Sequence, residues 1–177
     1  MQSIHLSETH DRLLLSGLFR NFLTAEKAYQ EAFQCGYTQG EINILMLDYT
    51  KKDYINEYKK FLSLEQPLID EVSGQKLNGI YTALTVLDKQ LVLHDLGLIV
   101  IGPLTNYLRR YRRLSDNMLE TLITCGISES QARKYELGLL MGGIILSVKS
   151  PAKNHNDIKL KHDWKRLSVY KLKLVTA

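Results

Sequence analysis

The chain has 177 residues, of which 45% are hydrophobic and 24% charged, so it is long enough for one globular domain with a substantial core. These ordinary fractions exclude a disordered or low-complexity chain, and we expect one domain over residues 1–151 and a basic segment over 152–177. The formal net charge of +4 is unevenly placed, because eight basic and two acidic residues lie between Lys149 and Lys173. That segment could meet an anionic partner, although a solvated segment is the simpler interpretation.

No targeting signal stands out. The first residues lack the basic region and apolar stretch of a secretory signal, so we expect a cytoplasmic protein. The longest nearly uncharged apolar run, LGLIVIGPL, is shorter than the roughly 20 residues that cross a bilayer as a helix, so we expect no transmembrane span. Cys35 and Cys125 lie far apart without CxxC spacing, which predicts two reduced thiols at helix ends.

The first elements follow a strand, helix, strand pattern. Residues 12–19 (RLLLSGLF) have the length and apolar character of a strand. Residues 21–37 repeat apolar side chains at helical spacing, with Thr24 as the expected N-cap and Gly36 at the end. Residues 41–48 (EINILMLD) alternate apolar side chains on both faces, as a strand buried on both sides does.

The middle of the chain is predicted to be a helical insertion at about residues 50–88. Residues 50–62 and 76–87 each place apolar side chains at helical spacing. Residues 91–104 leave two alternatives open: a strand from Leu98 to Ile101 that ends at Gly102-Pro103, or an all-helical hairpin. In the first alternative a helix follows from Leu104 to Arg113.

Two further helices are indicated by their ends. Residues 115–126 form an apolar stripe with Ser115 as the expected N-cap and Gly126 as the stop. Ser128 and Gln131 have capping-box spacing at the start of the second helix.

Gly142 and Gly143 stand between that second helix and an apolar run. A helix often ends on a residue with positive φ, so one glycine can turn the chain into a strand over residues 144–148, which Pro151 closes. A phosphate-binding loop has the reverse order, strand before glycines before helix, so this join is structural. The pattern predicts an α+β fold: a ferredoxin-like, largely antiparallel sheet of three to four strands with helices on one face.

Two stretches carry a family resemblance. In the first, a short strand precedes a helix with an acidic-x-Ala pattern at Glu26 and Ala28, then Gly36-Tyr37 and a strand with Ile42 and Ile44. The second begins at Gly102-Pro103. It continues with Gly126-Ile127, Ala132, Tyr135-Glu136, Gly138 and Gly142-Gly143. This ordered combination resembles the heat-induced stress protein family, also called the general stress protein 17M or YflT-like family.

The resemblance covers roughly residues 13–48 and 96–150, about half of the chain. Residues 50–90 depart from the family, because tyrosine-, lysine- and leucine-bearing sequence replaces its usual glycine- and alanine-rich middle. The resemblance implies a small α+β domain linked to bacterial stress responses, with no catalytic residues to carry over.

Acid–base side chains do not form a recognisable catalytic motif. His94-Asp95 and His162-Asp163 are chain neighbours, and His155 with Asp157 is a candidate metal pair. Neighbours on a helix or strand usually point in different directions, so we do not interpret these pairs as sites. The motifs of zinc proteases, paired-cysteine sites and nucleophile elbows do not occur. We therefore predict no enzyme, no metal site and no cofactor.

Arginine and tyrosine alternate in residues 107–113 (YLRRYRR). Guanidinium groups bind phosphate and stack on bases, and tyrosine rings offer stacking surfaces. Four arginines in five positions cannot all face one way on a helix, so a solvated helix end is the simpler interpretation. Trp164 is expected to anchor the basic C-terminal segment on the domain. The candidate anion-binding residues are Arg109, Arg110, Arg112, Arg113, Lys159, Lys161, Lys165 and Arg166.

The leading functional hypothesis is a non-enzymatic, stress-associated protein that forms a homo-oligomer or binds a protein partner. The alternative is binding of an anionic surface, either nucleic acid or an acidic membrane, through the basic residues. A small-molecule enzyme comes third, because the sequence shows no convergent set of polar residues.

Overall fold

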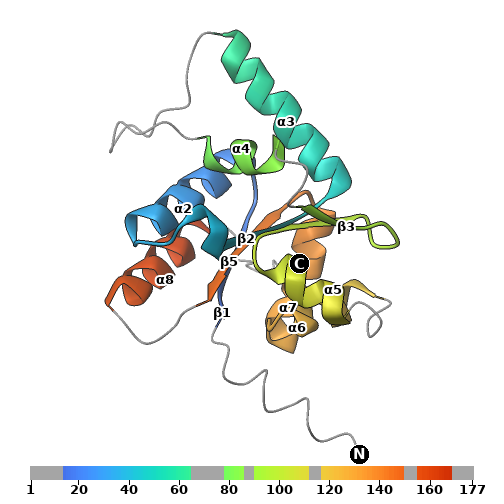
Figure 1. Ribbon diagram of the computed structural model, residues 1–177. Helices are drawn as coiled ribbons and strands as arrows, with labels where there is room; N and C mark the ends of the chain where they lie inside the picture. The colour runs from blue at the N-terminus through green and yellow to red at the C-terminus, as the bar shows by residue number, and fades with distance from the viewer. Residues whose placement is uncertain (1–13, 65–77, 86–89, 112–116, 150–154, 169–177) are drawn as a thin grey trace, which may run out of the picture.

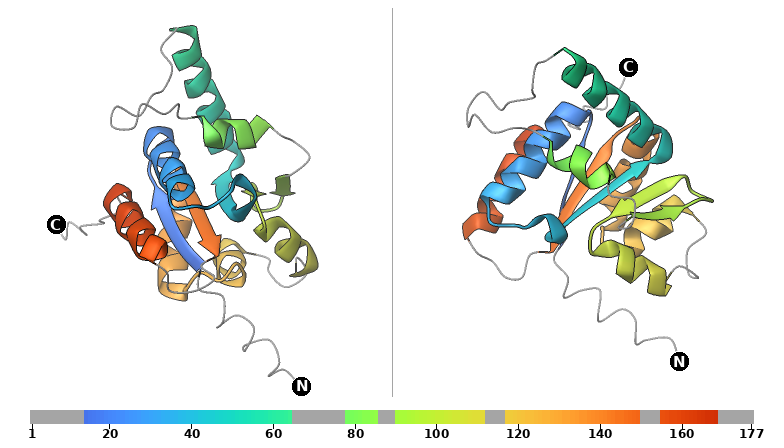
Figure 2. Two further views of the ribbon diagram at one scale, coloured as in Figure 1. Left: turned by 60° about the vertical axis from the view of Figure 1, so that its left-hand side comes forward. Right: turned by 45° about the horizontal axis from the view of Figure 1, so that its top comes forward.

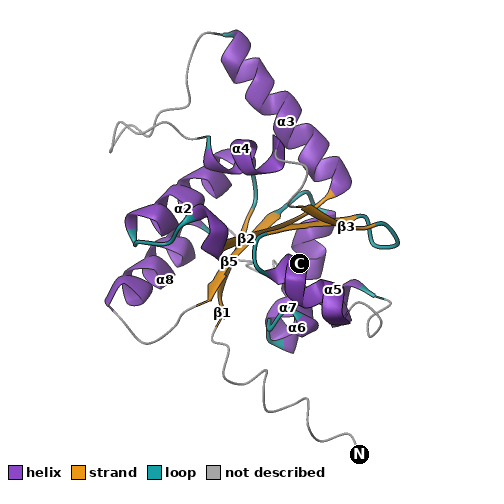
Figure 3. Ribbon diagram, in the orientation of Figure 1, coloured by secondary structure: helices purple, strands orange, loops and turns teal. Residues whose placement is uncertain are grey.

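The computed structural model describes residues 14–64, 78–85, 90–111, 117–149 and 155–168. Strands and helices are interspersed along the chain, which confirms the α+β class (Figures 1 and 3). The strands are β1 (Leu14–Phe19), β2 (Ile42–Leu47), β3 (Gln90–Leu93), β4 (Leu98–Ile101) and β5 (Ile144–Lys149). The helices are α2 (Phe22–Gln34), the 3₁₀ turn η1 (Gln39–Glu41), α3 (Asp48–Ser63), α4 (Gly79–Thr85), α5 (Leu104–Tyr111), α6 (Met118–Thr124), α7 (Glu129–Leu140) and α8 (His155–Leu167).

The described strands form one sheet in the order β1-β5-β2-β4-β3, and every neighbouring pair is antiparallel. The antiparallel arrangement is confirmed, but the prediction of three to four strands was wrong, because this part of the chain contributes five. The additional strand is β3, which forms a hairpin with β4 over residues 90–101. The alternative of a strand from Leu98 to Ile101 is therefore confirmed, and the all-helical hairpin was wrong. Leu93 pairs with Leu98 across a turn in which Gly97 has a φ of +62°.

Helices cover both faces of the sheet, so the prediction of helices on one face was wrong (Figure 2). Ile42, Ile44 and Met46 of β2 pack on one face with α2, α4 and α8. Leu45 and Leu47 of the same strand point to the other face, where α5, α6 and α7 lie. Both faces of the central strands are apolar, so each requires a covering layer. This three-layer arrangement does not confirm the ferredoxin-like expectation.

Several helix ends differ from prediction by a few residues. Asn21, not Thr24, is the N-cap of α2, and its Oδ1 accepts the Thr24 N–H at 2.9 Å. Ser115 lies outside the described residues, and Asn117 is the N-cap of α6. Gly126 ends α6 with a φ of +94°, as predicted. Cys35 and Cys125 are buried free thiols at the C-caps of α2 and α6.

The double glycine ends α7 as predicted and leads into β5. Gly142 has a φ of +88°, and its N–H donates to the Leu139 carbonyl at 3.0 Å. The Gly143 N–H donates to the Gly138 carbonyl at 2.8 Å, which completes the paired hydrogen bonds of a Schellman motif. Ser128 caps the other end of α7, where its Oγ accepts the Gln131 N–H at 3.4 Å.

Helix α8 packs beside α2 and belongs to the same hydrophobic core (Figure 2). Leu160 and Trp164 are almost completely buried, and the Trp164 indole N–H donates to the Ala28 carbonyl at 2.9 Å. The predicted anchoring role of Trp164 is therefore confirmed. In the described part of the chain, we find no helix with the length and apolarity to cross a membrane.

Candidate functional site

A cavity of about 460 Å³ lies at the end of the sheet where β2 begins and β4 ends. Its inner surface is apolar and buried, and its outer rim is mostly exposed, although Thr105 is buried and Gly102 is half-buried. The inner residues are Tyr29, Ile42, Ile44, Ala83 and Ile101, and the remaining lining residues are Gln39, Gly40, Thr82, Gly102, Pro103, Thr105, Asn106 and Arg109. Four segments of the chain, α2, η1–β2, α4 and β4–α5, therefore converge on it.

The turn between β4 and α5 shapes one wall of the cavity. Gly102 has a φ of +107°, and a Cβ atom there would lie 2.5 Å from the Ile42 carbonyl oxygen, so only glycine fits. Asn43 of the adjacent strand accepts the Leu104 N–H on its Oδ1 at 2.9 Å and donates to the Ser147 carbonyl at 3.4 Å. These contacts fix the first turn of α5 against the sheet.

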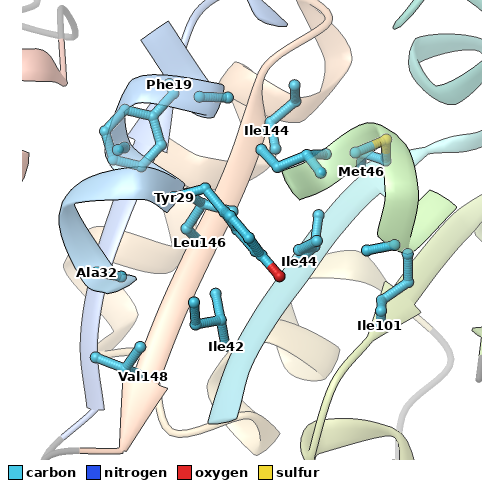
Figure 4. Packing of buried hydrophobic residues seen from close by; sticks show 14 of the residues in the cluster. Phe19, Tyr29, Ala32, Ile42, Ile44, Met46, Ile101, Ile144, Leu146 and Val148 are labelled. Carbon is cyan, nitrogen blue, oxygen red and sulfur yellow. The ribbon is translucent and has the colours of Figure 1, made fainter. Parts of the chain in front are cut away.

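Tyr29 contributes a buried hydroxyl that has no hydrogen-bond partner among the described residues. The side chain is 1% exposed, and its hydroxyl reaches between Ile42 and Ile44 toward Ile101 (Figure 4). Burial raises the pKa of Tyr29 far above its ordinary value of 10.0, and the nearby Glu26 raises it further, so the hydroxyl stays protonated. The inner end of the cavity therefore adjoins an unused hydrogen-bond donor, whose oxygen is covered by the residues packed around it.

Glu26 positions α4, which forms another wall. Its carboxylate accepts the Tyr54 hydroxyl at 2.6 Å and the N–H groups of Ile80 and Tyr81 at 3.3 and 3.1 Å. Burial raises the pKa of Glu26, and these donors act in the opposite direction. Gly79 allows α4 to approach closely, because a Cβ there would lie 2.4 Å from the Tyr29 ring.

The structure separates the basic residues that the sequence grouped as anion-binding candidates. Arg109 and Arg110 are exposed on α5, but only Arg109 lines the cavity. Arg112 and Arg113 lie outside the described residues. Helices α5 and α8 pack on opposite faces of the sheet, so their basic side chains do not form one surface. The exposed basic residues of α8 are Lys159, Lys161, Lys165 and Arg166.

Acidic side chains accompany the basic residues of α8. Burial and the neighbouring Asp163 raise the pKa of Glu31 of α2, and the nearby Lys159 and Arg166 lower it in part. Asp157 accepts a hydrogen bond from the Tyr37 hydroxyl. The charge of α8 is therefore mixed where it meets α2, and binding of an anionic surface through these residues stays a prediction.

Among the described side chains, the histidine pairs considered in the sequence do not meet a third ligand, and the His155 side chain lies outside them. His162 Nδ1 lies 3.9 Å from Asp163 Oδ1, and the His162 side chain is 80% exposed. His94 and Asp95 are exposed in the β3–β4 turn. Among the residues that the structure describes, no three His, Cys, Asp or Glu side chains gather in a way that could hold a metal ion.

Sequence reasoning missed the convergence of polar groups at the cavity. Tyr29 falls on the apolar stripe of its helix, so no sequence pattern indicates that its hydroxyl lacks a partner. Thr82 and Asn106 carry no sequence signal of a site, and they line one cavity only because of how α4 and α5 pack on the sheet.

Comparison of the chain with protein-family models, with curated proteins and with solved structures finds no match.

Proposed function

We propose that this chain binds a small organic molecule in the cavity between α2, α4, β2 and α5. The observation that carries the proposal is the Tyr29 hydroxyl, which is buried at the inner end without a partner among the described residues. A buried polar group without a hydrogen bond costs about 1–3 kcal/mol of folding free energy. A ligand oxygen that accepts from Tyr29 would recover this cost, whereas a purely structural tyrosine at this position gains nothing from its hydroxyl.

The dimensions and composition of the cavity support the same function. Its volume of about 460 Å³ falls in the range of small-molecule sites, and such sites combine an apolar interior with a few oriented polar groups. Here the apolar interior comes from Ile42, Ile44 and Ile101, and the polar groups come from α2, η1, α4 and α5. Convergence of separate segments on one volume is what a binding site requires.

The test is a fragment screen against the intact, ¹⁵N-labelled chain, observed by amide chemical shifts. The fragment set contains neutral, cationic and anionic compounds. We expect binding fragments to shift the amides of Gly40, Thr82, Gly102 and Asn106, which line the cavity. The same compounds should bind more weakly to Tyr29→Phe, which loses only the hydroxyl.

Two variants of α4 provide the matched control. Thr82 is exposed and lines the cavity, so Thr82→Trp should fill the opening and abolish these shifts. Thr85 is exposed on the same helix and is not a lining residue, so Thr85→Trp should bind fragments as the natural chain does. The proposal fails if no fragment shifts the cavity amides, or if Thr82→Trp binds the same fragments equally well.

A second candidate function is self-association. It is the function we expect if the chain is a stress-associated, cytoplasmic protein that resembles the general stress protein 17M family. Two observations favour a second copy of this chain as the partner. Leu137, Leu140 and Met141 at the end of α7 are 59%, 61% and 68% exposed. In the described part of the chain, β1 pairs with β5 on one side only, so its other edge is available for strand pairing.

Light scattering on the eluting peak of a size-exclusion column tests this second function. We expect an oligomer that Leu137→Lys dissociates, while Gln131→Lys, an equal change at another exposed position of α7, leaves it intact. A natural chain that remains monomeric at high concentration would rule self-association out.

A further inference from the structure

We infer that the ligand of this cavity is an organic acid, with its carboxylate at the rim near Arg109 and its apolar body against the isoleucine floor. This inference rests on the proposed function and names the chemical class of the molecule that the cavity takes. Three features of the cavity lead to it: the charge of its lining, the helix that begins at its rim, and the apolar character of its floor.

The charged lining favours an anion. Among the described residues that line the cavity, Arg109 is the only charged one. A guanidinium group can donate two parallel hydrogen bonds to a carboxylate, and charge-assisted bonds of this kind are the strongest in proteins. An organic cation would meet this positive charge without a carboxylate in the lining to balance it.

Helix α5 begins at the rim and adds to the same preference. Pro103, Thr105 and Asn106, at and within its first turn, all line the cavity. The N-terminal end of a helix carries partial positive charge, which favours a nearby anion. Asn43 holds this turn in place through the Leu104 N–H, so the helix end is fixed before a ligand arrives. The buried Tyr29 hydroxyl is an independent third donor at the inner end.

The floor excludes a bare inorganic anion as the preferred ligand. Ile42, Ile44, Ala83 and Ile101 surround the inner volume, and a phosphate or sulfate ion would lose its hydration there without replacement. An apolar ligand body, in contrast, gains free energy from leaving water. The class that satisfies rim and floor together is a carboxylic acid with an apolar body. An oxygen at its distal end would accept the hydrogen bond from Tyr29.

The test uses three probes of one shape and different charge: phenylpropanoate, phenylpropanol and phenylpropylammonium. Each is titrated into the intact chain, and binding is followed by the amide shifts of the cavity residues. We expect the acid to bind at least about tenfold more tightly than the alcohol, as one charge-assisted hydrogen bond provides. We expect the ammonium compound to bind least.

Two neighbouring arginines give a matched pair of variants. Arg109→Gln should weaken binding of the acid to the level of the alcohol without changing the affinity for the alcohol. Arg110→Gln removes the same charge one residue away, outside the lining, and should keep the preference for the acid. Hydroxyphenylpropanoate, which carries a distal oxygen, should bind more tightly than phenylpropanoate to the natural chain but not to Tyr29→Phe.

The outcomes separate this inference from the proposed function. Suppose that fragments bind in the cavity, but the alcohol or the ammonium compound binds as tightly as the acid, or none of the three probes binds. The acid class is then overturned, and ligand binding in the cavity stands. If inorganic phosphate binds as tightly as phenylpropanoate, the apolar half of the inference is overturned. If no fragment and no probe shifts the cavity amides, the proposed function and this inference fail together. Far-ultraviolet circular dichroism of each variant shows whether it is folded.

Discussion

At the scale of single residues, the buried position of Tyr29 explains its ring but not its hydroxyl. Its ring packs against Phe33 and the α4 backbone, which a phenylalanine would do equally well. Its hydroxyl adds a buried donor without a partner among the described residues, which lowers stability and leaves a contact for a ligand. Groups that cost stability and have no structural use are typical of binding sites.

Tyr29→Phe should therefore stabilise the free protein while it weakens ligand binding. We expect the free energy of unfolding to rise by about 1 kcal/mol, because the variant no longer buries an unpaired hydroxyl. Urea unfolding followed by circular dichroism measures the change. Tyr54→Phe is the comparison, since it removes a hydroxyl that does bond to Glu26 and should lower stability. A loss of stability in Tyr29→Phe would indicate that its hydroxyl has a partner.

Glu26 should make stability depend on pH in the direction opposite to most carboxylates. Because burial raises its pKa, the folded chain holds the Glu26 proton more tightly than the unfolded chain. The protonated group therefore adds stability at pH values below the ordinary 4.5, and this contribution is lost as the pH rises through the raised pKa. Glu26→Gln keeps an acceptor oxygen for α4 but cannot ionise.

Urea unfolding at a series of pH values checks this prediction. We expect the stability of the natural chain, relative to Glu26→Gln, to fall as the pH rises from below 4.5 to neutral. The control is Glu129→Gln, because Glu129 is an exposed glutamate at the start of α7. A stability difference that does not change with pH would contradict the raised pKa.

Sequence reasoning identified part of the candidate site at this scale. Arg109 was among the candidate anion-binding residues and does line the cavity, whereas Arg110 was chosen on equal grounds and does not. The two arginines are indistinguishable in the sequence, because only the packing of α5 decides which one faces the opening. The roles of Tyr29 and Glu26 depend on α4, which lies more than 50 residues away along the chain.

At the scale of elements, the end of α7 shows how closely local signals and packing are connected. Gly142 provides the positive φ of the Schellman motif, and Gly143 lies where there is no room for a side chain. A Cβ atom on Gly143 would be 2.7 Å from the Gly138 carbonyl oxygen and 2.9 Å from Leu18. The two glycines are therefore required for different physical reasons.

Gly143→Ala should lower the free energy of unfolding by about 1–3 kcal/mol, because the added methyl group overpacks the junction of α7 and β5. Thermal and urea unfolding measure the loss. Gly40→Ala is the control, because a methyl group on Gly40 would meet no other part of the described chain within 4 Å and the position needs no positive φ. Equal stability of the two variants would mean that the junction relaxes around the methyl group.

Element types were predictable where the signal is local. Strand β2, helix α7 and the glycine ends of α2 and α6 follow from spacing and backbone conformation within a few residues. Strand β3 was not predicted, because its four residues, half-buried and buried in alternation, carry too little pattern alone. These residues form a strand because they pair with β4, and that pairing depends on the rest of the sheet as well as on the short turn between them.

At the scale of the whole molecule, α8 completes the layer that α2 begins. Trp164 meets the Phe19 ring edge-on, with centroids 5.8 Å apart, and its indole N–H bonds to the backbone of α2. The basic segment beyond residue 151 therefore supplies part of the core. The described basic side chains of this segment, Lys159, Lys161, Lys165 and Arg166, lie on the exposed side of a helix whose other side is buried.

Trp164→Ala should lower the free energy of unfolding by about 3–5 kcal/mol, as removal of a fully buried aromatic side chain does. Urea unfolding followed by circular dichroism measures the loss, because this variant removes the chain's single tryptophan. Lys165→Ala, at the exposed neighbouring position, should leave stability nearly unchanged. If Trp164→Ala were equally neutral, α8 would not be part of the cooperative core.

The sequence by itself determined the α+β class, most strands and helices, and the glycines that end α2, α6 and α7, because these depend on interactions between residues a few positions apart. Only the tertiary structure decided that β5 lies between β1 and β2 in the sheet, since the paired residues are 100 to 135 positions apart and long-range pairing leaves no local signal. The two apolar faces of Ile42–Leu47 indicated a strand buried on both sides, but the prediction of helices on one face did not follow it, and which helices cover each face depends on packing. The cavity follows from that packing, because its walls are built by four segments that meet only when the layers assemble.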